Sequence, residues 1–515
     1  MYLTQSLHRN LQQNPDRPAT IYRDRVRTVA ESADRIARLA GALSGLGVHQ
    51  GDRVGILALN SDRYQEYFHA APWLGAVLNP VNIRWSPAEI SYSLIESDTR
   101  VLFVDDAFAP MIAALREKFP GLSTVIHCGD GELPAGALSY ETLIADSAPI
   151  EDTRTGGDDL LGVFYTGGTT GHPKGVMLSH NNLLTSSIGS LASGHFVSPG
   201  GRLLHTAPLF HLAGIAVWAA GCQVGSTHVI VPMFSPAEVI AAIADHQVTD
   251  ALLVPTMIQM LVDDPAIADS DMSSLVHLVY GASPISEAVL GRARKVFPSA
   301  GFTQAYGMTE LSPCATMLTP TDHEDPALHR SAGRAAPHVE VRIVDPNDNE
   351  VARGEVGEVV VRGDNVMVGY WNRPEDTAAA VRDGWMHTGD GGRMDENGYV
   401  FIVDRIKDMI ITGGENVYSA EVENALASHP AVAACAVIGV PDADWGERVH
   451  AVVVLLPGQQ ATVDEIRTHC KTLIAGYKAP RSVDFVDAMP MSGAGKILKR
   501  ELRKQYWDDT GNQVS

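Results

Sequence analysis

The sequence predicts an α/β protein with a large N-terminal domain of two helix-covered mixed sheets and a small β-rich subdomain, followed by a small α+β C-terminal domain. Up to about residue 330, short apolar runs alternate with segments of helical periodicity. Beyond that point, short strand-like runs are separated by Gly, Asp and Asn. A mixed pattern restarts near residue 404 and is long enough for a separate domain.

The first region contains the elements of parallel sheets. We expect strands over residues 53–59, 101–104, 228–231, 251–254 and 275–280, and helices over 64–78, 87–97 and 237–246. Strands that alternate with helices at this spacing are typical of parallel sheets covered on both faces.

The later region divides into two parts. We expect subdomain strands over 340–344, 357–362 and 398–403, then a helix from Ser419 and strands over 433–440 and 449–456. We therefore place the N-terminal domain at residues 1–405 and the C-terminal domain at 406–515.

Composition excludes some classes of protein. The 515 residues include 39 basic and 61 acidic side chains, for a net charge of −22, with 45% apolar and 19% charged residues. That balance suits a folded protein and argues against a general nucleic-acid binder, because nothing neutralises phosphates across the whole surface. The net negative charge is still compatible with one local phosphate site.

The five cysteines are far apart in the sequence and form no CxxC pair. A disulfide framework or zinc ribbon is therefore not expected, and reduced thiols in the cytoplasm are the simpler interpretation. The N-terminus is polar by its tenth residue and resembles no signal peptide.

One long stretch, between Arg202 and Glu238, contains no Asp, Glu, Lys or Arg. Pro208, Gly214 and Pro232 interrupt it, so its apolar parts are too short to span about 30 Å of hydrocarbon. We expect a buried helix and strand beside a ligand pocket and no transmembrane segment.

The strongest motif is Phe164-Tyr-Thr-Gly-Gly-Thr-Thr-Gly-His-Pro-Lys-Gly175. Glycines let backbone N–H groups approach anionic oxygens, while hydroxyls and an ammonium add donors, so the pattern predicts a phosphate loop. It is not a Walker sequence, and a solvated turn between strands is the alternative. The predicted phosphate ligands are Thr166, Gly167, Gly168, Thr169, Thr170, Gly171 and Lys174.

This stretch resembles the phosphate loop of the adenylate-forming enzymes, which include acyl- and aryl-CoA synthetases, luciferases and peptide-synthetase adenylation domains. The family's other motifs follow in order: Pro208–Gly214, Tyr280–Ser283, Gln304–Glu310, Trp385–Asp390, Val403–Asp408, Gly413–Val417 and Gly495–Arg500. The resemblance implies ATP and CoA as co-substrates, Mg²⁺, a small-molecule carboxylic acid and a mobile C-terminal domain.

The resemblance also implies a nucleotide site. Tyr306 would stack on adenine, Thr309 would donate to the α-phosphate, and Glu310 with Thr169 would hold Mg²⁺. The remaining nucleotide residues it implies are Gly281, Ala282, Ser283, Gln304, Ala305, Gly307, Asp390 and Arg405. Taken alone, Gln304–Glu310 could be a capped strand-to-helix turn, and the Asp390–Arg405 pair a turn aspartate with a surface arginine.

By the same resemblance, His211 lies beside the carboxylate of the acid as a gate, although a lone buried histidine is more often a core residue. The implied acyl pocket comprises His211, Ala213, Gly214, Tyr280, Gly281, Gly307 and Pro313. Relatives acting on hydroxycinnamates usually carry a tyrosine where this chain has Ala213, which favours an aliphatic or other hydrophobic acid.

In the C-terminal domain the resemblance assigns adenylation to Lys496, a hinge to Lys407 and the CoA side to Gly413 and Gly414. The approach to Lys496 reads Met491-Ser-Gly-Ala-Gly495 instead of the usual Thr- or Ser-rich segment. The neighbouring cations up to Lys504 have a simpler interpretation as a solvated helix end.

These features predict an AMP-forming acyl-CoA ligase. Two alternatives stay open: an aryl- or hydroxycinnamate-CoA ligase, and an adenylation enzyme that loads a separate carrier protein. A regulator that only binds nucleotide would not need Lys496. The sequence leaves the oligomeric state open, a homodimer included.

Overall fold

The computed structural model describes residues 1–166, 173–283, 285–405, 408–412, 415–442, 445–491 and 497–507, without the side chains of Arg405 and Asn416. The chain forms two compact units, one of Met1–Val341 with Val361–Met386 and one of Arg342–Val360 with His387–Ser515. The mixed α/β class with a large N-terminal part and a smaller C-terminal part is confirmed. The boundary at residue 405, where we expect a hinge, stays a prediction.

The first unit contains two large sheets. Over the described residues, one sheet has nine strands, in the order β16 (Arg334–Ala335), β15 (Cys314–Leu318), β14 (Gly301–Gly307), β13 (His277–Gly281), β12 (Asp250–Leu253), β10 (Arg202–His205), β11 (Thr227–Ile230), β1 (Pro18–Tyr22) and β2 (Arg25–Thr28). Its centre, from β1 to β14, is parallel, as strand–helix alternation predicted.

The other large sheet has eight strands in the described part of the chain. Their order is β19 (Gly369–Tyr370), β9 (Lys174–Ser179), β8 (Leu160–Thr166), β4 (Val77–Pro80), β3 (Arg53–Leu57), β5 (Val101–Val104), β6 (Thr124–His127) and β7 (Leu138–Ser139). The strands from β8 to β7 are parallel, whereas β8, β9 and β19 pair antiparallel, so this sheet is mixed as expected.

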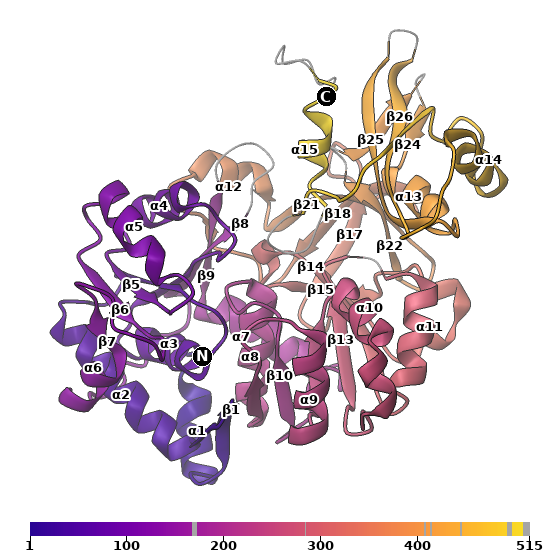
Figure 1. Cartoon of the computed structure of the whole chain (residues 1–515). Coiled ribbons are helices and arrows are strands. Elements are labelled where there is room, and N and C mark those ends of the chain that lie inside the picture. The colour runs from indigo at the N-terminus through magenta and orange to yellow at the C-terminus, as the bar shows by residue number, and fades with distance from the viewer. Residues whose placement is uncertain are drawn as a thin grey trace. The chain divides into compact units, whose positions relative to one another are not determined.

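Helices cover both sheets (Figure 1). They are α1 (Gln5–Gln13), α2 (Val29–Gly45), α3 (Asp62–Trp73), α4 (Pro87–Glu96), α5 (Ile112–Lys118), α6 (Tyr140–Asp146), α7 (His180–Leu191), α8 (Leu212–Val224), α9 (Pro236–His246), α10 (Pro255–Asp263), α11 (Glu287–Val296) and α12 (Pro374–Ala380). Every residue of α3 is buried, and Phe68 of α3 packs on Trp218 of α8 with ring centroids 5.0 Å apart. Helices α3 and α8 therefore join the two layered parts of the unit.

Side chains at the helix starts explain where several helices begin. Thr28 accepts from the Glu31 amide while the Glu31 carboxylate accepts from the Thr28 amide, so α2 opens on a capping box. Ser86 and Glu89 form the same arrangement at the start of α4. Each cap satisfies backbone donors that would otherwise lack partners, which is worth about 1 kcal/mol.

The expected helix over residues 64–78 is wrong at its C-terminal end. Helix α3 stops at Trp73, and β4 begins at Val77, in the middle of the eight-stranded sheet. Gly75 adopts a φ of +79° between them, a left-handed conformation that ends a helix and favours glycine. The strand is buried throughout and therefore shows no alternation of polar and apolar residues.

Two smaller sheets follow in the chain, each with five strands over the described residues. One is the expected β-rich part, with β17 (Glu340–Val344), β18 (Val356–Arg362), β21 (Trp385–Met394) and β20 (Val381–Arg382) in order and β22 (Val400–Arg405) beside β21. The other has β24 (Glu415–Val417), β23 (Ile410–Thr412), β26 (Gly446–Leu455) and β25 (Val432–Asp442) in order, with β27 (Ser482–Phe485) beside β26. Helices α13 (Ser419–Ala427), α14 (Val463–Leu473) and α15 (Lys499–Arg503) belong to the second unit.

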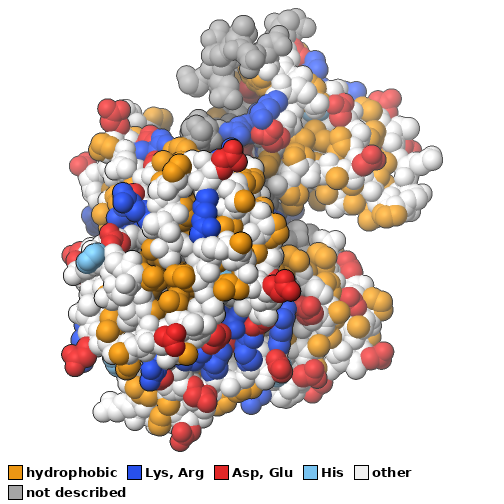
Figure 2. Space-filling model, turned by 60° about the vertical axis from the view of Figure 1, so that its left-hand side comes forward, with side chains coloured by type: hydrophobic (Ala, Val, Ile, Leu, Met, Phe, Trp, Pro, Cys, Tyr) orange, Lys and Arg blue, Asp and Glu red, His pale blue; other side chains and the backbone are white. Residues whose placement is uncertain are grey.

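The charge-free stretch between Arg202 and Glu238 forms a buried helix, α8, and a buried strand, β11, as expected. Within the described parts of the chain, no helix has the length and hydropathy that a bilayer crossing requires. On the face shown in Figure 2, acidic and basic side chains are interspersed, and no broad basic field covers it.

Candidate active site

The phosphate-loop motif lies at a hairpin of the eight-stranded sheet. Strands β8 and β9 pair antiparallel, with Thr166 at the end of β8 opposite Lys174 at the start of β9. The predicted ligands Gly167, Gly168, Thr169, Thr170 and Gly171 lie outside the described residues. The described flanks therefore hold Thr166 and Lys174 one strand spacing apart.

Lys174 has two partners in the first unit. Its ammonium lies 3.0 Å from Oδ2 of Asp376, at the start of α12, and 5.0 Å from the centre of the Tyr370 ring in β19. The face of an aromatic ring attracts a cation, and the carboxylate is half-exposed. Lys174 is therefore held at the loop while still able to exchange its carboxylate partner for a phosphate.

Glu310 meets the same tyrosine. The Tyr370 hydroxyl donates to Oε1 of Glu310 over 2.9 Å, and the backbone carbonyl of Glu310 accepts from the Met367 amide. Burial, with the charge and hydrogen bond of Glu310, raises the pKa of Tyr370, so the phenol keeps its proton as donor. Glu310 is 6% exposed and ionisable, and carboxylate oxygens are preferred Mg²⁺ ligands, so the donor chemistry fits this ion.

The predicted adenine-side residues lie on two adjacent parallel strands. Gly281 ends β13 and pairs with Ala305 of β14, the strand that also carries Gln304, Tyr306 and Gly307. A Cβ at Gly281 would lie 2.2 Å from the Ala305 carbonyl oxygen, so only glycine fits there. Ala282 and Ser283 follow directly, Ala282 with a φ of +68°.

The chain turns sharply after β14. Thr309 and Glu310 form a short 3₁₀ turn (Thr309–Leu311), and the Pro313 carbonyl accepts from the Met308 amide over 3.0 Å. A Cβ at Gly307 would lie 1.8 Å from that same carbonyl oxygen. The close backbone approach therefore requires Gly307, and it brings Pro313 beside the end of β14.

The predicted acyl-pocket residue Tyr280 is fully buried. It is 1% exposed, and its hydroxyl lies 2.7 Å from Nε2 of His323 and 3.2 Å from Oε1 of Gln304. Burial raises the pKa of Tyr280 and lowers that of His323. The tyrosine hydroxyl is thus committed to neutral partners within the protein.

His211, Ala213 and Gly214 mark the start of α8. His211 is the N-cap residue, makes no side-chain capping hydrogen bond and packs on Phe210 with ring centroids 4.1 Å apart. Its side chain and that of Ala213 are half-buried. A Cβ at Gly214 would lie 2.9 Å from the Pro208 carbonyl oxygen, so glycine allows the helix to start close to the preceding loop.

In the second unit, Asp390 of β21 pairs with Arg405 of β22 in an antiparallel register. The Asp390 amide donates to the Thr388 hydroxyl over 3.1 Å. The backbone register thus brings the two predicted ribose-binding residues opposite each other. The Arg405 side chain and the predicted residues Lys407, Gly413, Gly414 and Lys496 lie outside the described residues.

Sequence reasoning missed three side chains in contact with predicted site residues: Tyr370, Asp376 and His323. Tyr370 is 60 residues from Glu310 and belongs to a two-residue strand, which is too short to show periodicity. The sequence around Lys174 gives no sign that Tyr370 lies beside it. Only the pairing of β19 with β9 in the folded chain reveals the contact of Tyr370 with Lys174.

Comparison with known proteins places this geometry in a family. The sequence matches the AMP-binding enzyme family over residues 7–371 and the AMP-binding enzyme C-terminal domain over residues 421–496. It is 37% identical to a fatty acid–[acyl-carrier-protein] ligase of Streptomyces coeruleorubidus, over 100% of this chain and 98% of that protein. It is 40% identical to a feruloyl-CoA synthase of Amycolatopsis sp, over 93% of this chain and 94% of that protein.

A solved structure supports the same family assignment. The o-succinylbenzoate CoA synthetase of Bacillus subtilis, in complex with its acyl-adenylate intermediate, superimposes with a TM-score of 0.85 at 30% identity, covering 97% of this chain and 98% of the other. Fold, sequence and motif order therefore agree over nearly the whole length. The chain belongs to the AMP-binding enzyme family and is an acid–thiol ligase of the acyl-CoA synthetase type.

Proposed function

We propose that this enzyme activates an aliphatic or other hydrophobic carboxylic acid with ATP and transfers the acyl group to CoA. The observation that carries the adenylation half is the convergence of Lys174 and Glu310 on Tyr370. A cation for phosphate oxygens and a carboxylate for a divalent ion, both anchored by one buried phenol, suit the transfer of a nucleotidyl group.

Two displacements make up the reaction. A carboxylate oxygen of the acid attacks the α-phosphorus of ATP, and the bond to pyrophosphate breaks. The CoA sulfur then attacks the acyl carbonyl, and AMP leaves with the oxygen that joined it to the acid. Neither step needs a nucleophilic side chain, so the protein's contribution is alignment and charge stabilisation.

Each predicted residue has a role in that scheme. Thr166, Lys174 and the loop between them bind the phosphates, Tyr306 and Gly281 border the adenine, and Thr309 donates to the α-phosphate. Glu310 and Thr169 would hold Mg²⁺, which neutralises phosphate charge when bound. Asp390 and Arg405 bind the ribose, and Lys496 stabilises the charge that moves to pyrophosphate.

The preference for an aliphatic acid rests on helix α8. Its first turn carries Ala213, a small side chain, and the helix contains no charged residue. No tyrosine is present at that position to bond a phenol. A hydrophobic chain can therefore lie against this helix without leaving a polar group unpaired.

A second candidate is an aryl-CoA ligase, favoured by the 40% identity to a feruloyl-CoA synthase. A carrier protein as acceptor in place of CoA is favoured by the 37% identity to an acyl-carrier-protein ligase. Acid-dependent pyrophosphate release should be measured over alkanoates of increasing length and over cinnamates, with CoA or a phosphopantetheinylated carrier as acceptor. Higher kcat/KM for cinnamates, or turnover with the carrier alone, would replace the leading proposal.

The division of labour between the half-reactions rests on Lys496. We expect Lys496→Ala to lower acid-dependent pyrophosphate release by about 100-fold or more, since one preorganised donor is typically worth that much. Thioester formation from a synthetic acyl-adenylate should persist. Lys504→Ala, which removes an exposed lysine paired with Glu501, is the matched control. Equal loss of both half-reactions would contradict the assignment.

Two coarser expectations belong to the same proposal. A C-terminal domain from residue 406, with its hinge at Lys407, would alternate between the two half-reactions. The five cysteines are free thiols in the structure, which suits a reducing compartment such as the cytoplasm.

A further inference from the structure

A chain of side chains with alternating charge connects the two strands of the phosphate-loop hairpin in the first unit. In order these are Lys174, Asp376, Arg373, Glu96 and the uncharged Tyr165. Lys174 begins β9 and Tyr165 lies near the end of β8, whereas the middle three residues come from α12, its N-cap and the end of α4 (Figure 1). The two strands of the hairpin are therefore linked through residues outside the hairpin.

Asp376 lies between two cations. Its Oδ2 is 3.0 Å from the Lys174 ammonium nitrogen and 3.7 Å from Nη1 of Arg373. Both contacts use the same carboxylate oxygen, and the side chain of Asp376 is 38% exposed. A small rotation of this side chain can therefore exchange its close partner, Lys174, for Arg373.

Arg373 is anchored from its other side. Its Nη2 donates to the Tyr92 hydroxyl over 2.9 Å, and its Nε lies 3.7 Å from Oε1 of Glu96. The Tyr165 hydroxyl donates to the other oxygen of Glu96 over 2.7 Å. Burial, with the hydrogen bond and charge of Glu96, raises the pKa of Tyr165, so this phenol keeps its proton as a donor. Arg373 is thus held beside Asp376 by groups other than Asp376 itself.

Arg373 also has unused hydrogen-bonding capacity. Both carboxylates near its guanidinium, those of Glu96 and Asp376, are 3.7 Å away, which is beyond hydrogen-bond distance. Its Nε is buried and has no hydrogen-bond partner among the described residues. The guanidinium therefore gains a charge-assisted hydrogen bond if Asp376 moves towards it.

Two anions compete for Lys174 in the proposed reaction. Among the described residues, Asp376 is the carboxylate that pairs with Lys174, whose ammonium also contacts the face of the Tyr370 ring. A phosphate of ATP bound to the same ammonium would lie close to this carboxylate, and the two negative charges would repel each other. Movement of Asp376 to Arg373 relieves that repulsion and keeps the carboxylate paired.

We propose that Asp376 is a positioning residue that sets the affinity for ATP: it holds Lys174 in the free enzyme and moves to Arg373 when a phosphate binds. This inference rests on the proposed function, which assigns Lys174 to the phosphates. Because Asp376 competes with ATP, its carboxylate lowers the affinity, whereas a carboxylate that only oriented Lys174 for the nucleotide would raise it. The sign of the change on removal of this charge therefore distinguishes the two roles.

The test measures the binding of Mg²⁺–ATP to the full chain by calorimetry, without an acid and at constant ionic strength. We expect Asp376→Asn to lower the Kd for ATP about two- to fivefold, as a half-exposed ion pair is typically worth, with kcat for pyrophosphate release little changed. Asp376→Glu restores a carboxylate and should return the Kd towards that of the wild type. Glu375→Gln removes the same charge from an exposed neighbour that pairs with no described cation, and should leave the Kd unchanged.

A double-mutant cycle tests the part of Arg373. Arg373→Gln should raise the Kd for ATP, because the displaced carboxylate then has no second partner. In the Asp376→Asn background the same substitution should have no effect, since Arg373 acts through that carboxylate. Thermal unfolding checks that each variant is folded, and Asp376→Asn with Asp376→Glu decides the inference if Arg373→Gln is not.

An unchanged or higher Kd for Asp376→Asn, or an equal fall for Glu375→Gln, would overturn the inference. Such a result would leave the assignment of Lys174 to phosphate intact. If Lys174→Ala binds ATP as tightly as the wild type, both the inference and that assignment are wrong. Acid-dependent pyrophosphate release by the wild type would still support the ligase function, so the two failures are distinguishable.

Discussion

The hydroxyl of Tyr370 donates a 2.9 Å hydrogen bond to Oε1 of Glu310, while the face of its ring lies 5.0 Å from the Lys174 ammonium. One phenol therefore contacts both Glu310, which the motifs assign to a divalent ion, and Lys174, which they assign to a phosphate. The contact is available because β19 pairs with β9, the strand that Lys174 begins.

Tyr370→Phe tests this relationship. The substitution keeps the ring beside Lys174 and removes only the donor to Glu310, whose loss is worth about 1.5–3 kcal/mol for a hydrogen bond to a charged group. We expect the Mg²⁺–ATP dependence of pyrophosphate release to shift by one to two orders of magnitude, with the KM for the acid little changed. An unaltered Mg²⁺ dependence would show that Glu310 keeps its orientation without the phenol.

Gly307→Ala tests the close approach of Gly307 to the Pro313 backbone at the end of β14. Its Cβ would lie 1.8 Å from the Pro313 carbonyl oxygen, so the turn must move, at a cost of about 1–3 kcal/mol or more. Thermal unfolding and ATP binding should both weaken. Gly291→Ala, in α11 with nothing within 4 Å of the added Cβ, should instead stabilise the protein by about 1 kcal/mol. Similar results for the two variants would contradict the steric argument.

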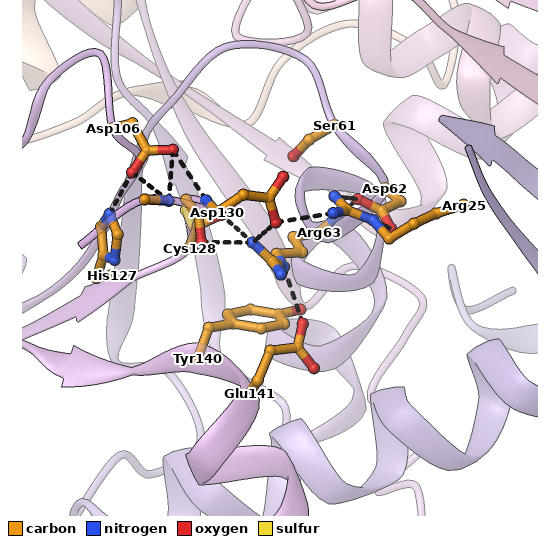
Figure 3. Close-up of polar contacts among 12 residues, drawn as sticks. Arg25, Ser61, Asp62, Arg63, Asp106, His127, Cys128, Asp130, Tyr140 and Glu141 are labelled. Atoms are coloured by element: carbon orange, nitrogen blue, oxygen red, sulfur yellow. Dashed lines mark hydrogen bonds and ion pairs between the residues drawn. The ribbon is translucent and has the colours of Figure 1, made fainter. Parts of the chain in front are cut away.

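Asp62→Asn tests the buried ion pairs that Asp62 makes with Arg25 (Figure 3) and with Arg27. Burial alone would raise the pKa of Asp62, but the hydrogen bond from Arg25 and the charges of Arg25 and Arg27 hold it below its usual range. Because Asp62 is buried, removal of its charge should cost about 3–5 kcal/mol at pH 7.

The sign of the pH dependence follows. A carboxyl whose pKa is lower in the folded state stabilises the fold above its unfolded pKa of about 4, and loses that contribution as the pH falls through the folded value. Urea unfolding of the wild type and Asp62→Asn should therefore converge as the pH drops from 7 to below 4. The exposed Asp24→Asn should show no such convergence, and a constant gap for Asp62→Asn would contradict a stabilising role for its ion pairs.

Ala213→Trp tests the acyl pocket. The residue is half-buried on the first turn of α8, so a large ring there should shorten the space for the acid. We expect the KM for long alkanoates to rise tenfold or more, while the KM for ATP and for short acids changes little. A uniform rise for acids of every length would indicate a folding defect instead.

The sequence alone predicts the fold class of this protein and the type of reaction. The glycine-rich motif at Phe164–Gly175, the order of the motifs and the alternation of strands and helices determine the α/β class and the chemistry of nucleotide activation, because these features are local and each has its own residue pattern. The −22 charge argues against a broad polyanion surface, and phosphate binding by single cations such as Lys174 stays a prediction.

Tertiary structure alone decided the remaining features. Strand β4 shows no alternation because it is buried on both faces, so it reads as the end of a helix. The contacts of Tyr370 with Glu310, of Tyr280 with His323 and of Asp62 with Arg25 join residues 37 to 60 positions apart. Such pairs form only when strand register and helix packing bring distant segments together, and no local pattern in the sequence encodes that distance.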